Sequence, residues 1–588
     1  MISYIQKINL LIGKKNKSKF FLTWFLSLLS SIVEIVSIAI LSQYISFILN
    51  FQNKNFVFHY KFLTDFLDFK SMTNTEILFF LSLILLIFTI LKNFFLLFVI
   101  FFENYIIYKI KLKNSLKLYS KYIVSDYSFF FKKNPFIIIR NLSGEMDRAH
   151  LYILQNAIAL RETFLVSFIV LFLCTSNLLI TFFALSVVLT FVFVYFMFFK
   201  KVLENKGKLT QELEGKLMSK IETTFNSIKE IKIFNSESIF CNSFGNYSKS
   251  YGISGLYPNI ISKLPRYILE IILISIIVII ILFSINFNDN FEESISIISI
   301  FAISALRLIP ALTLLSSCIA SIKNLAPSFD NIILEMSYKK SKSLILEKKK
   351  DYQKYKNNSV SLKRIVFQDV CFSYEKESNF KIKNLNLEIV TGKITGIVGE
   401  SGSGKSTIVD ILLGLLKPDG GKILFDGKEI EYKKLFNLKI FGYVPQNTHL
   451  LESSIRENIA FGIEPHLIDD EKVISLLKMV NLYQHVFNLK NNIYEKVNYS
   501  GSNFSGGQIQ RLSIARSLYF NPKFVILDES TNSLDGLNES KLLEEIKRLK
   551  NKIAFVIISH KSSTISYCDR VYNIEKGQIK LPLIKNDE

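Results

Sequence analysis

A glycine-rich segment at residues 399–407 constrains the fold of this chain more than any other feature. It reads Gly-Glu-Ser-Gly-Ser-Gly-Lys-Ser-Thr and fits the pattern G-x-x-x-x-G-K-[ST]. The segment follows a strand-like run at residues 394–398 and precedes a helix-like run at residues 408–416. In that setting glycines turn backbone N–H groups inward, where they can cradle phosphates. Lys405 can then reach the β- and γ-phosphates of a nucleotide, and the Ser406 hydroxyl can hold Mg²⁺.

Net charge and cysteine spacing exclude several other classes of protein. The 588 residues carry a formal net charge of +21, which alone is compatible with a nucleic-acid partner. The lysines cluster between long apolar runs, however, as in the cytosolic loops of a membrane protein. We therefore expect no nucleic-acid partner. The five cysteines are scattered without paired spacing, so the sequence predicts neither a disulfide framework nor a cysteine-based metal site.

The first half of the chain contains a series of apolar runs, each near the ~20 residues that a membrane-spanning helix requires. They lie at residues 20–49, 77–102, 157–180, 181–199, 267–287 and 294–322. The third and fourth runs almost touch, which predicts a very short loop between them. Runs this long and apolar do not fit the core of a soluble protein. We therefore predict a six-span α-helical membrane domain over residues 1–326.

Lysine and arginine set the expected orientation of this domain. They are frequent in the N-terminal segment, in the loop after the second run and in the loop after the fourth run. Residues 288–293, between the last two runs, contain neither and are acidic. Because basic loops remain cytosolic, both chain termini are predicted to be cytosolic. The two long basic loops read as helical extensions of the spans.

The pattern changes in the C-terminal half. Residues 327–360 are rich in lysine and are predicted to form a connector. Beyond them, β-like runs at residues 367–374, 524–527 and 553–558 alternate with helical runs. That alternation is typical of an α/β nucleotide-binding domain, which we predict over residues 361–588.

Further motifs follow the glycine-rich segment in a fixed order. Residues 504–508 read Phe-Ser-Gly-Gly-Gln, and Asp528 and Glu529 close an apolar strand. These match the signature LSGGQ, with Phe for Leu, and the Walker B motif of ABC transporters. The other matches are Tyr374 at the adenine-stacking aromatic, Gln446 at the Q-loop, residues 533–535 at the D-loop and His560 at the switch histidine. Residues 364–580 therefore resemble the P-loop ATPase domain of an ABC transporter.

The resemblance implies a role for each matched residue. Asp528 would hold Mg²⁺ together with Ser406 and Gln446. Glu529 would be the general base for the attacking water, and His560 would contact the γ-phosphate or position that water, with Gln446 also in the catalytic group. The residues implied in ATP binding are Tyr374, Gly399, Ser401, Gly402, Ser403, Gly404, Lys405, Ser406, Thr407, Ser505, Gly506, Gly507, Gln508 and Asp535.

The signature also implies an assembly. Ser505 and Gly507 begin a predicted helix whose positive end suits an anion. In the family, that end faces ATP held by the opposite subunit. Since these residues contain one ATPase domain and six predicted spans, the resemblance implies a homodimer with two composite ATP sites. The turn before the signature, at residues 497–501, lacks the acidic residue usual in exporters, which leaves the coupling between domains open.

The membrane half resembles exporter-type ABC domains and, within them, bacterial flippases for lipid-linked oligosaccharides. The likeness rests on Val33-Glu34, on Pro-Arg-Tyr-Ile-Leu-Glu at residues 265–270 and on Arg-Leu-Ile-Pro at residues 307–310. It implies ATP-driven transfer of a polyprenyl-pyrophosphate-linked oligosaccharide from the inner to the outer leaflet of the bacterial cytoplasmic membrane. The alternatives are an exporter of another lipid, a drug or a peptide, and an ATP-gated channel or regulator. Intact Glu529 and His560 count against a regulator.

Charges within the spans bear on the substrate. Glu34, Lys92 and Arg307 each fall near the middle of a run, where a charge costs about 2.5–3.5 kcal/mol and faces water or a partner. They can form a salt bridge between Glu34 and one of the cations. Alternatively, the excess of cations can line a cavity for an anionic headgroup such as a pyrophosphate. In addition, Phe58, Phe62, Phe66 and Phe69 recur at helical spacing, which predicts an external helix that lies on the membrane or on the protein.

Overall fold

The computed structural model describes residues 11–13, 16–49, 74–287, 291–337, 362–374, 381–429, 440–498, 501–530 and 536–584. The chain divides into two compact units. The first comprises residues 1–125 and 130–344, and the second comprises residues 126–129 and 345–588.

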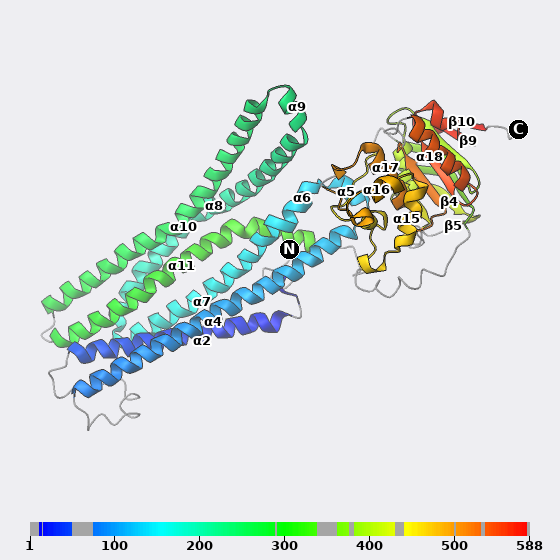
Figure 1. Ribbon diagram of the computed structural model, residues 1–588. Helices are drawn as coiled ribbons and strands as arrows, with labels where there is room; N and C mark the ends of the chain where they lie inside the picture. Colours follow the sequence, from blue (N-terminus) through cyan, green and yellow to red (C-terminus); the bar gives the residue numbers. More distant parts are fainter. Residues whose placement is uncertain are drawn as a thin grey trace. The chain divides into compact units, whose positions relative to one another are not determined.

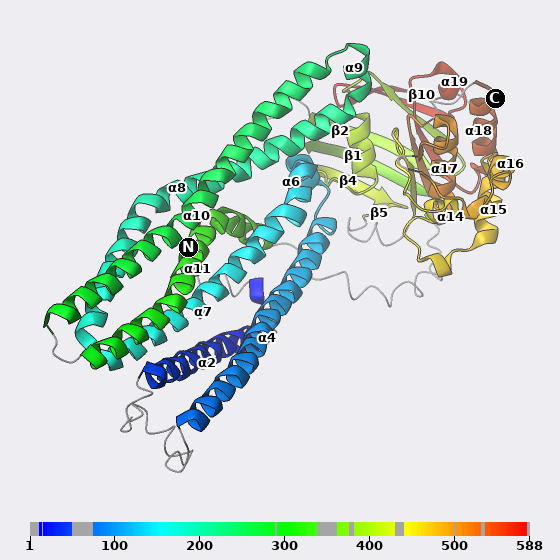
Figure 2. The same cartoon turned by 60° about the vertical axis from the view of Figure 1, so that its left-hand side comes forward.

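Long helices dominate the described part of the first unit (Figure 1). They are α2 (Lys17–Leu49), α4 (Asn74–Ile123), α7 (Met146–Ser176), α8 (Leu178–Asn226), α10 (Glu237–Phe287) and α11 (Phe291–Ser337). Shorter elements connect them: α5 (Ser128–Lys132), α6 (Pro135–Arg140), the π-helix η3 (Asn141–Glu145) and α9 (Ile228–Ile233). Each predicted apolar run lies within one long helix, apart from the junction between the third and fourth. Helices α8 and α10 run side by side to a tip formed by α9, and α2 lies along α4 and α7 (Figure 2).

Five stretches of the described helices are long and apolar enough to cross a membrane. They are Lys17–Ser42, Thr75–Ile123, Pro135–Ser176, Leu178–Asn226 and Ser299–Ser337. These confirm a helical region with several membrane-length apolar helices. The predicted fifth run lies in α10, whose last side chains are outside the described part, so a count of six crossings stays a prediction.

The helix boundaries refine the sequence prediction at two places. Helix α7 ends at Ser176, and the Asn177 side chain accepts a hydrogen bond of 3.1 Å from the Ile180 backbone N–H to begin α8. The very short loop is thus present, three residues before its predicted position, because an asparagine cap terminates one helix and starts the next.

Helix α11 continues to Ser337 and enters the predicted connector. Phe329, Ile332 and Ile333 are buried there, and the Phe329 ring stacks on Tyr152 of α7 with 4.2 Å between ring centroids. These apolar positions at helical spacing extend the helix, so the prediction that the connector begins at residue 327 is wrong for its first part. Residues 338–360 lie outside the described residues. Helices α4, α8 and α10 also continue well past the predicted spans, which confirms the helical extensions.

The described part of the second unit contains two sheets. An antiparallel sheet has the order β2-β1-β4-β5, and a larger sheet has the order β10-β9-β3-β8-β7-β6. In the larger sheet all strands are parallel except β10. The strands are β1 (Arg364–Ser373), β2 (Lys381–Val390), β3 (Ile394–Gly399), β4 (Gly420–Phe425), β5 (Lys428–Glu429), β6 (Phe441–Val444), β7 (Phe524–Asp528), β8 (Ala554–Ile558), β9 (Arg570–Glu575) and β10 (Gln578–Ile584). The three strands predicted after the connector correspond to β1, β7 and β8.

Helices complete this α/β unit. They are α12 (Lys405–Leu412), α14 (Ile455–Ile459), α15 (Asp470–Met479), α16 (Tyr483–Phe487), α17 (Gly506–Leu518), α18 (Gly536–Leu549) and α19 (Ser562–Ile565). Alternate residues of the parallel strands belong to two different hydrophobic cores. Phe524 packs with the antiparallel sheet and α12, whereas Val525 packs with α15, α17 and α18. Such alternation requires strands that are covered on both faces.

Helix α12 begins and ends earlier than the apolar run at residues 408–416 predicts. Gly404 caps its N-terminus at φ +111°, and Gly414 follows its C-terminus at φ +77°. The Leu415 N–H donates a hydrogen bond of 2.8 Å to the Asp410 carbonyl oxygen. Left-handed glycines at both ends therefore fix the helix, and the last apolar residues of the run belong to the turn after it.

Candidate nucleotide and substrate sites

Four predicted nucleotide-site segments meet at one edge of the parallel sheet. The glycine-rich loop follows β3, Gln446 follows β6, Asp528 and Glu529 end β7, and His560 follows β8. The pairing register aligns these strand ends: Val444 lies opposite Leu527, and Asp528 lies opposite Ile558. Ligands of open parallel sheets bind at the carboxyl ends of the strands, so the topology itself gathers these side chains.

The glycine-rich loop has a backbone that other residues could not adopt. Gly402 and Gly404 have φ values of +79° and +111°. At Gly399, a Cβ atom would lie 2.3 Å from the Ile574 carbonyl oxygen. The loop is therefore packed against β9 on one side, and its left-handed glycines give it the backbone conformation that a phosphate-binding loop uses.

Polar groups of this loop fit a bound anion. The Ser403 hydroxyl is buried and lacks a hydrogen-bond partner among the described residues. The Lys405 ammonium donates to the carbonyl oxygens of Gly399 and Glu400 at 2.7 and 2.8 Å, so it folds back over the loop. Burial lowers the pKa of Lys405, and the carboxylates of Glu529 and Asp528 oppose that shift. An anion at the loop would give the Ser403 hydroxyl a partner and the Lys405 ammonium a counter-charge, which is the fit expected for nucleotide phosphates.

Tyr374 lies beside the first turn of α12. Its hydroxyl is 3.1 Å from Thr407 Oγ1, at hydrogen-bond distance, and its ring meets the edge of Phe372 at 5.1 Å. The ring is half-exposed. The structure thus connects Tyr374 to the phosphate-binding segment, and its stacking on adenine stays a prediction.

The three residues predicted to act in hydrolysis come together. Gln446 donates a hydrogen bond of 2.8 Å to one carboxylate oxygen of Glu529, and His560 Nε2 lies 3.3 Å from the other. The backbone of Glu529 has φ +48°, a left-handed conformation that is uncommon outside glycine. Both oxygens of the candidate base are thus held by side chains from two neighbouring strand ends.

Asp528 is the candidate Mg²⁺ ligand, and Tyr443 donates a hydrogen bond of 3.1 Å to its carboxylate. Burial raises the pKa of Asp528; the Tyr443 hydrogen bond opposes this shift, Glu529 adds to it and Lys405 opposes it. The exposed residue Ser406 lies in the first turn of α12, and the Gln446 amide oxygen remains for a metal because its nitrogen faces Glu529. This oxygen-rich donor set suits Mg²⁺. The sequence interpretation missed Tyr443, which lies on β6; no local motif marks it, because its partner Asp528 is 85 residues away.

The signature segment forms a reciprocal cap at the start of α17. Ser505 Oγ accepts from the Gln508 N–H at 3.3 Å, and the Gln508 side chain accepts from the Ser505 N–H at 2.8 Å. Ser505 and Gly506 are exposed. The predicted helix start is confirmed, and the positive end of a 13-residue helix is open to solvent in the single chain.

Some predictions fall on residues outside the described part. They concern Asp535 with the rest of the D-loop, the phenylalanine stripe at residues 58–69, and the middle of the turn at residues 497–501.

The three predicted membrane charges are gathered around α2. Arg307 Nε of α11 lies 3.4 Å from the Glu34 carboxylate. Lys92 of α4 donates a hydrogen bond of 3.2 Å to the Ser37 hydroxyl. Glu34 and Lys92 are buried, whereas the Arg307 side chain keeps 44% of its surface exposed. The salt-bridge geometry foreseen for Glu34 is therefore present, and Lys92 is the cation placed beside a neutral partner.

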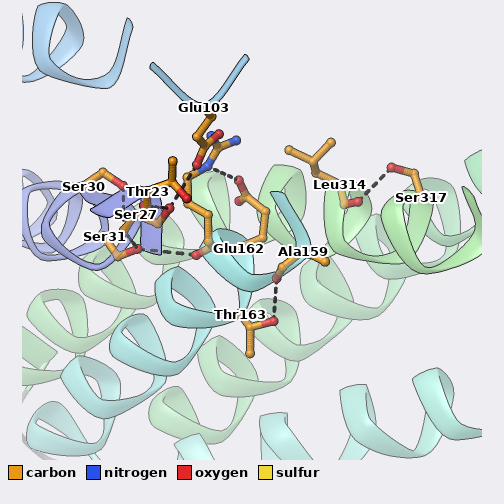
Figure 3. A network of polar contacts seen from close by, with 11 residues as sticks. Thr23, Ser27, Ser30, Ser31, Glu103, Ala159, Glu162, Thr163, Leu314 and Ser317 are labelled. Carbon is orange, nitrogen blue, oxygen red and sulfur yellow. Dashed lines mark hydrogen bonds and ion pairs between the residues drawn. The ribbon is translucent and has the colours of Figure 1, made fainter. Parts of the chain in front are cut away.

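A second charged layer was missed by the sequence interpretation (Figure 3). The Glu103 carboxylate accepts a hydrogen bond of 3.0 Å from the Ser27 hydroxyl and one of 2.9 Å from the Arg161 guanidinium. Arg161 also lies 3.2 Å from Glu162, and its carbonyl accepts a hydrogen bond from Ser31. Arg161 and Glu162 lie just inside the third predicted run rather than at its centre, which is why a search for central charges omitted them.

This second layer corrects the expected charge balance. Glu34, Lys92 and Arg307 leave one positive charge, but Glu103, Arg161 and Glu162 leave one negative charge. The two layers are separate, because the stretch of α4 from Lys92 to Glu103 spans about 16 Å at 1.5 Å per residue. The positive excess is therefore local to the first layer and does not extend through the helical region.

The outer face of α2 has the opposite character. Its buried face carries Ser27, Ser31 and Glu34, whereas Phe21, Phe25 and Ile32 are exposed. A helix that is apolar outside and polar inside suits a hydrocarbon surrounding and a polar interior.

Comparison with known proteins supports this division of the chain. A family described as "ABC transporter" matches residues 382–532. A putative export ATP-binding/permease protein of Rickettsia prowazekii is 35% identical over 38% of this chain and 38% of its own length. The leukotoxin translocation ATP-binding protein of Mannheimia glucosida is 37% identical over 37% of this chain and 30% of its own length. The chain thus aligns with well under half the length of these two relatives.

Two further comparisons cover most of the chain. The ATP-dependent lipid A-core flippase of Francisella novicida is 27% identical over 79% of this chain and 77% of its own length. The structure of a bacterial Atm1-family ABC exporter with ATP bound superposes with a TM-score of 0.76 and 17% identity, covering 97% of this chain and 96% of the exporter. The chain therefore has the fold of an ABC exporter half-transporter, in which a region of several apolar helices precedes a C-terminal α/β ABC ATPase domain.

Proposed function

We propose that this chain is one half of a homodimeric, ATP-hydrolysing flippase of the bacterial cytoplasmic membrane, with both termini cytosolic. Its substrate would be a polyprenyl-pyrophosphate-linked oligosaccharide, moved from the inner to the outer leaflet. The observation that carries the enzymatic part is the position of Glu529, whose two carboxylate oxygens are held by Gln446 and His560 at the strand edge that carries the phosphate loop.

The residues divide the work of hydrolysis. The loop N–H groups and Lys405 bind the phosphates of ATP, and Ser403 gains a partner for its buried hydroxyl. Ser406, Asp528 and Gln446 would hold Mg²⁺, which would offset the negative charge of the phosphates. Glu529 accepts the proton of the attacking water, while Gln446 and His560 keep the carboxylate turned toward it.

Two surfaces support a homodimer. The exposed positive end of α17 needs an anion, and ATP bound by a second copy supplies one. In addition, the extension of α4 beyond the predicted span carries a stripe of large apolar side chains that are 45–63% exposed in the single chain. They are Tyr105, Tyr108, Leu112, Leu116, Tyr119 and Ile123. Their spacing of three and four residues is that of a helix face packed on another helix, and a second copy would cover it.

The first charged layer supports an anionic substrate. Lys92 and Arg307 exceed Glu34 by one charge, and two chains would bring two such layers to one cavity. A phosphate-bearing headgroup is attracted to that excess much more strongly in a low-dielectric surrounding than in water. The flippase relative that covers most of this chain supports a lipid, whereas the leukotoxin translocation relative matches only about a third of the chain.

Reconstitution of the purified full-length protein tests the substrate. We expect ATP hydrolysis and flipping to rise with a polyprenyl-pyrophosphate oligosaccharide and to remain basal with the same oligosaccharide on an uncharged polyprenol. Stimulation by lipid A-core alone would place the chain with lipid A transporters. Stimulation by neither lipid would refute a flippase of anionic lipids.

Charge variants test the cavity. Lys92→Gln and Arg307→Gln should each reduce flipping more than basal ATP hydrolysis. The double variant Glu34→Gln/Arg307→Gln separates the two explanations, because it removes the ion pair without leaving an unpaired charge. It should fold well but still flip poorly if the cation binds the substrate. Recovery of flipping in the double variant would assign Arg307 to folding alone.

A further inference from the structure

A buried carboxylate outside the assigned nucleotide residues contacts the segment that follows His560. Glu539 belongs to the first turn of α18 and is 5% exposed. One of its oxygens accepts a hydrogen bond of 2.6 Å from Thr564 Oγ1, and the other accepts one of 3.0 Å from Lys561 Nζ. Both partners belong to the segment that begins directly after His560.

This segment is held at several points. The Lys561 backbone N–H donates a hydrogen bond of 3.1 Å to the buried Ser559 hydroxyl, and Thr564 lies fully buried within α19. Glu539 thus bridges two of its residues from the side of α18, with both carboxylate oxygens satisfied. A buried carboxylate with complete partners fixes its surroundings, because every displacement would break a charged hydrogen bond.

His560 itself has little packing to hold it. Its side chain is 47% exposed, and its contact with Glu529 is 3.3 Å. The ring position therefore depends on the backbone of the residues that follow it. Since catalysis requires geometry accurate to well within ~1 Å, that backbone needs an anchor.

We propose that Glu539 is a positioning residue for ATP hydrolysis, which anchors Lys561 and Thr564 so that His560 stays beside Glu529. The proposal rests on the proposed ATPase function. In this role Glu539 acts through the segment after His560, which it contacts at Lys561 and Thr564. Because α18 begins directly after the predicted D-loop at residues 533–535, the same carboxylate ties that helix to the switch segment.

The test measures kcat, KM for ATP and ATP binding in the full-length protein. Glu539→Gln keeps the size of the side chain and weakens both bonds. We expect kcat to fall by about 10–100-fold while KM and ATP binding stay within about threefold, as for a displacement of about 1 Å. Glu545→Gln is the matched control, since Glu545 lies on the same helix in a surface ion pair with Arg548. It should leave kcat unchanged.

A double-mutant cycle separates positioning from folding. If Glu539 acts through His560, then Glu539→Gln should lower kcat little further in a His560→Ala background. An additive loss would show that it acts elsewhere and overturn the proposal, as would a wild-type kcat in folded Glu539→Gln. If that variant does not fold, Thr564→Val and Lys561→Arg replace it: Thr564→Val should lower kcat, whereas Lys561→Arg should retain it. A wild-type protein without ATP hydrolysis would instead refute the proposed function.

Discussion

Replacement of Glu529 by glutamine tests the proposed chemistry most directly. The glutamine side chain would keep the length of the glutamate and could still contact Gln446 and His560. It would also adopt the backbone φ of +48° at no greater cost than glutamate, since neither side chain is β-branched. The change therefore removes the basicity of one group and leaves the site otherwise intact.

The expected loss follows from that role. Removal of a general base slows a reaction by about 10²–10⁴-fold, or roughly 2.7–5.5 kcal/mol of transition-state stabilisation. The phosphate loop and the Lys405 ammonium remain in place when Glu529 is replaced, so ATP binding should persist and ATP should accumulate on the protein. Phosphate release and equilibrium binding of labelled ATP, both measured on purified full-length protein, give the two quantities.

Lys405→Ala provides the contrasting control. It removes a phosphate-binding cation, so ATP binding itself should weaken along with hydrolysis. If Glu529→Gln retained hydrolysis within a few-fold of wild type, another group would have to take the proton, and the assignment of Glu529 as the base would fail. If Glu529→Gln lost ATP binding instead, its main role would be electrostatic.

Three further predictions concern assembly, pH and the phosphate loop. A mixed dimer of Lys405→Ala and Ser505→Arg chains should trap ATP at one site, because one composite site carries both changes and the other carries none; equal loss at both sites would exclude the shared arrangement. Burial, with repulsion by Asp528, raises the pKa of Asp410 from 3.8 to about 6, so ionisation between about pH 4 and 6 costs stability. Asp410→Asn should therefore increase the free energy of unfolding at pH 7 by ~1–2 kcal/mol after allowance for solvent screening, which raises the melting temperature. Below about pH 4 the melting temperature should change little. A uniform shift at all pH values would contradict this reasoning. Gly399→Ala should abolish ATP binding and lower stability, because its Cβ would lie 2.3 Å from a carbonyl oxygen of β9; unchanged binding would show that the loop can move.

Local sequence patterns were sufficient for most of the architecture. The apolar runs predicted the long helices, and the β-like runs corresponded to β1, β7 and β8. The errors occurred where one residue or a tertiary contact sets a boundary. Asn177 ends α7 within an apolar stretch, and Phe329 extends α11 by packing on Tyr152. Hydrophobic periodicity reports which residues are buried but not where a cap or a distant partner ends the helix.

The candidate site was predictable where the chain carries local motifs. The predicted strands before Glu529 and His560 indicated separate strand ends, Gln446 was identified by its motif alone, and the parallel sheet brings all three residues together. Tyr443 and Glu539 were not predictable, because their roles depend on partners 85 and 22 to 25 residues away. A tyrosine in a strand and a glutamate in a helix are otherwise common, and only the fold identifies their partners.

The membrane charges illustrate the same limit and carry a mechanistic consequence. Counting central charges predicted an excess of cations, yet Glu103 and Glu162 share the single cation Arg161 in a second layer. In the first layer, Glu34 forms an ion pair with Arg307, which leaves the positive charge of Lys92 without a negative partner among the described residues of that layer. If a pyrophosphate is the substrate, Lys92 is then the first cation available to it, and full engagement of Arg307 requires the substrate to compete with Glu34. Glu34→Gln should consequently tighten substrate binding while Lys92→Gln weakens it, as measured by the substrate concentration for half-maximal stimulation of ATP hydrolysis. The two changes in substrate affinity need not be equal in size. If Glu34→Gln weakened substrate binding instead, the glutamate would orient Arg307 for the substrate rather than compete with it.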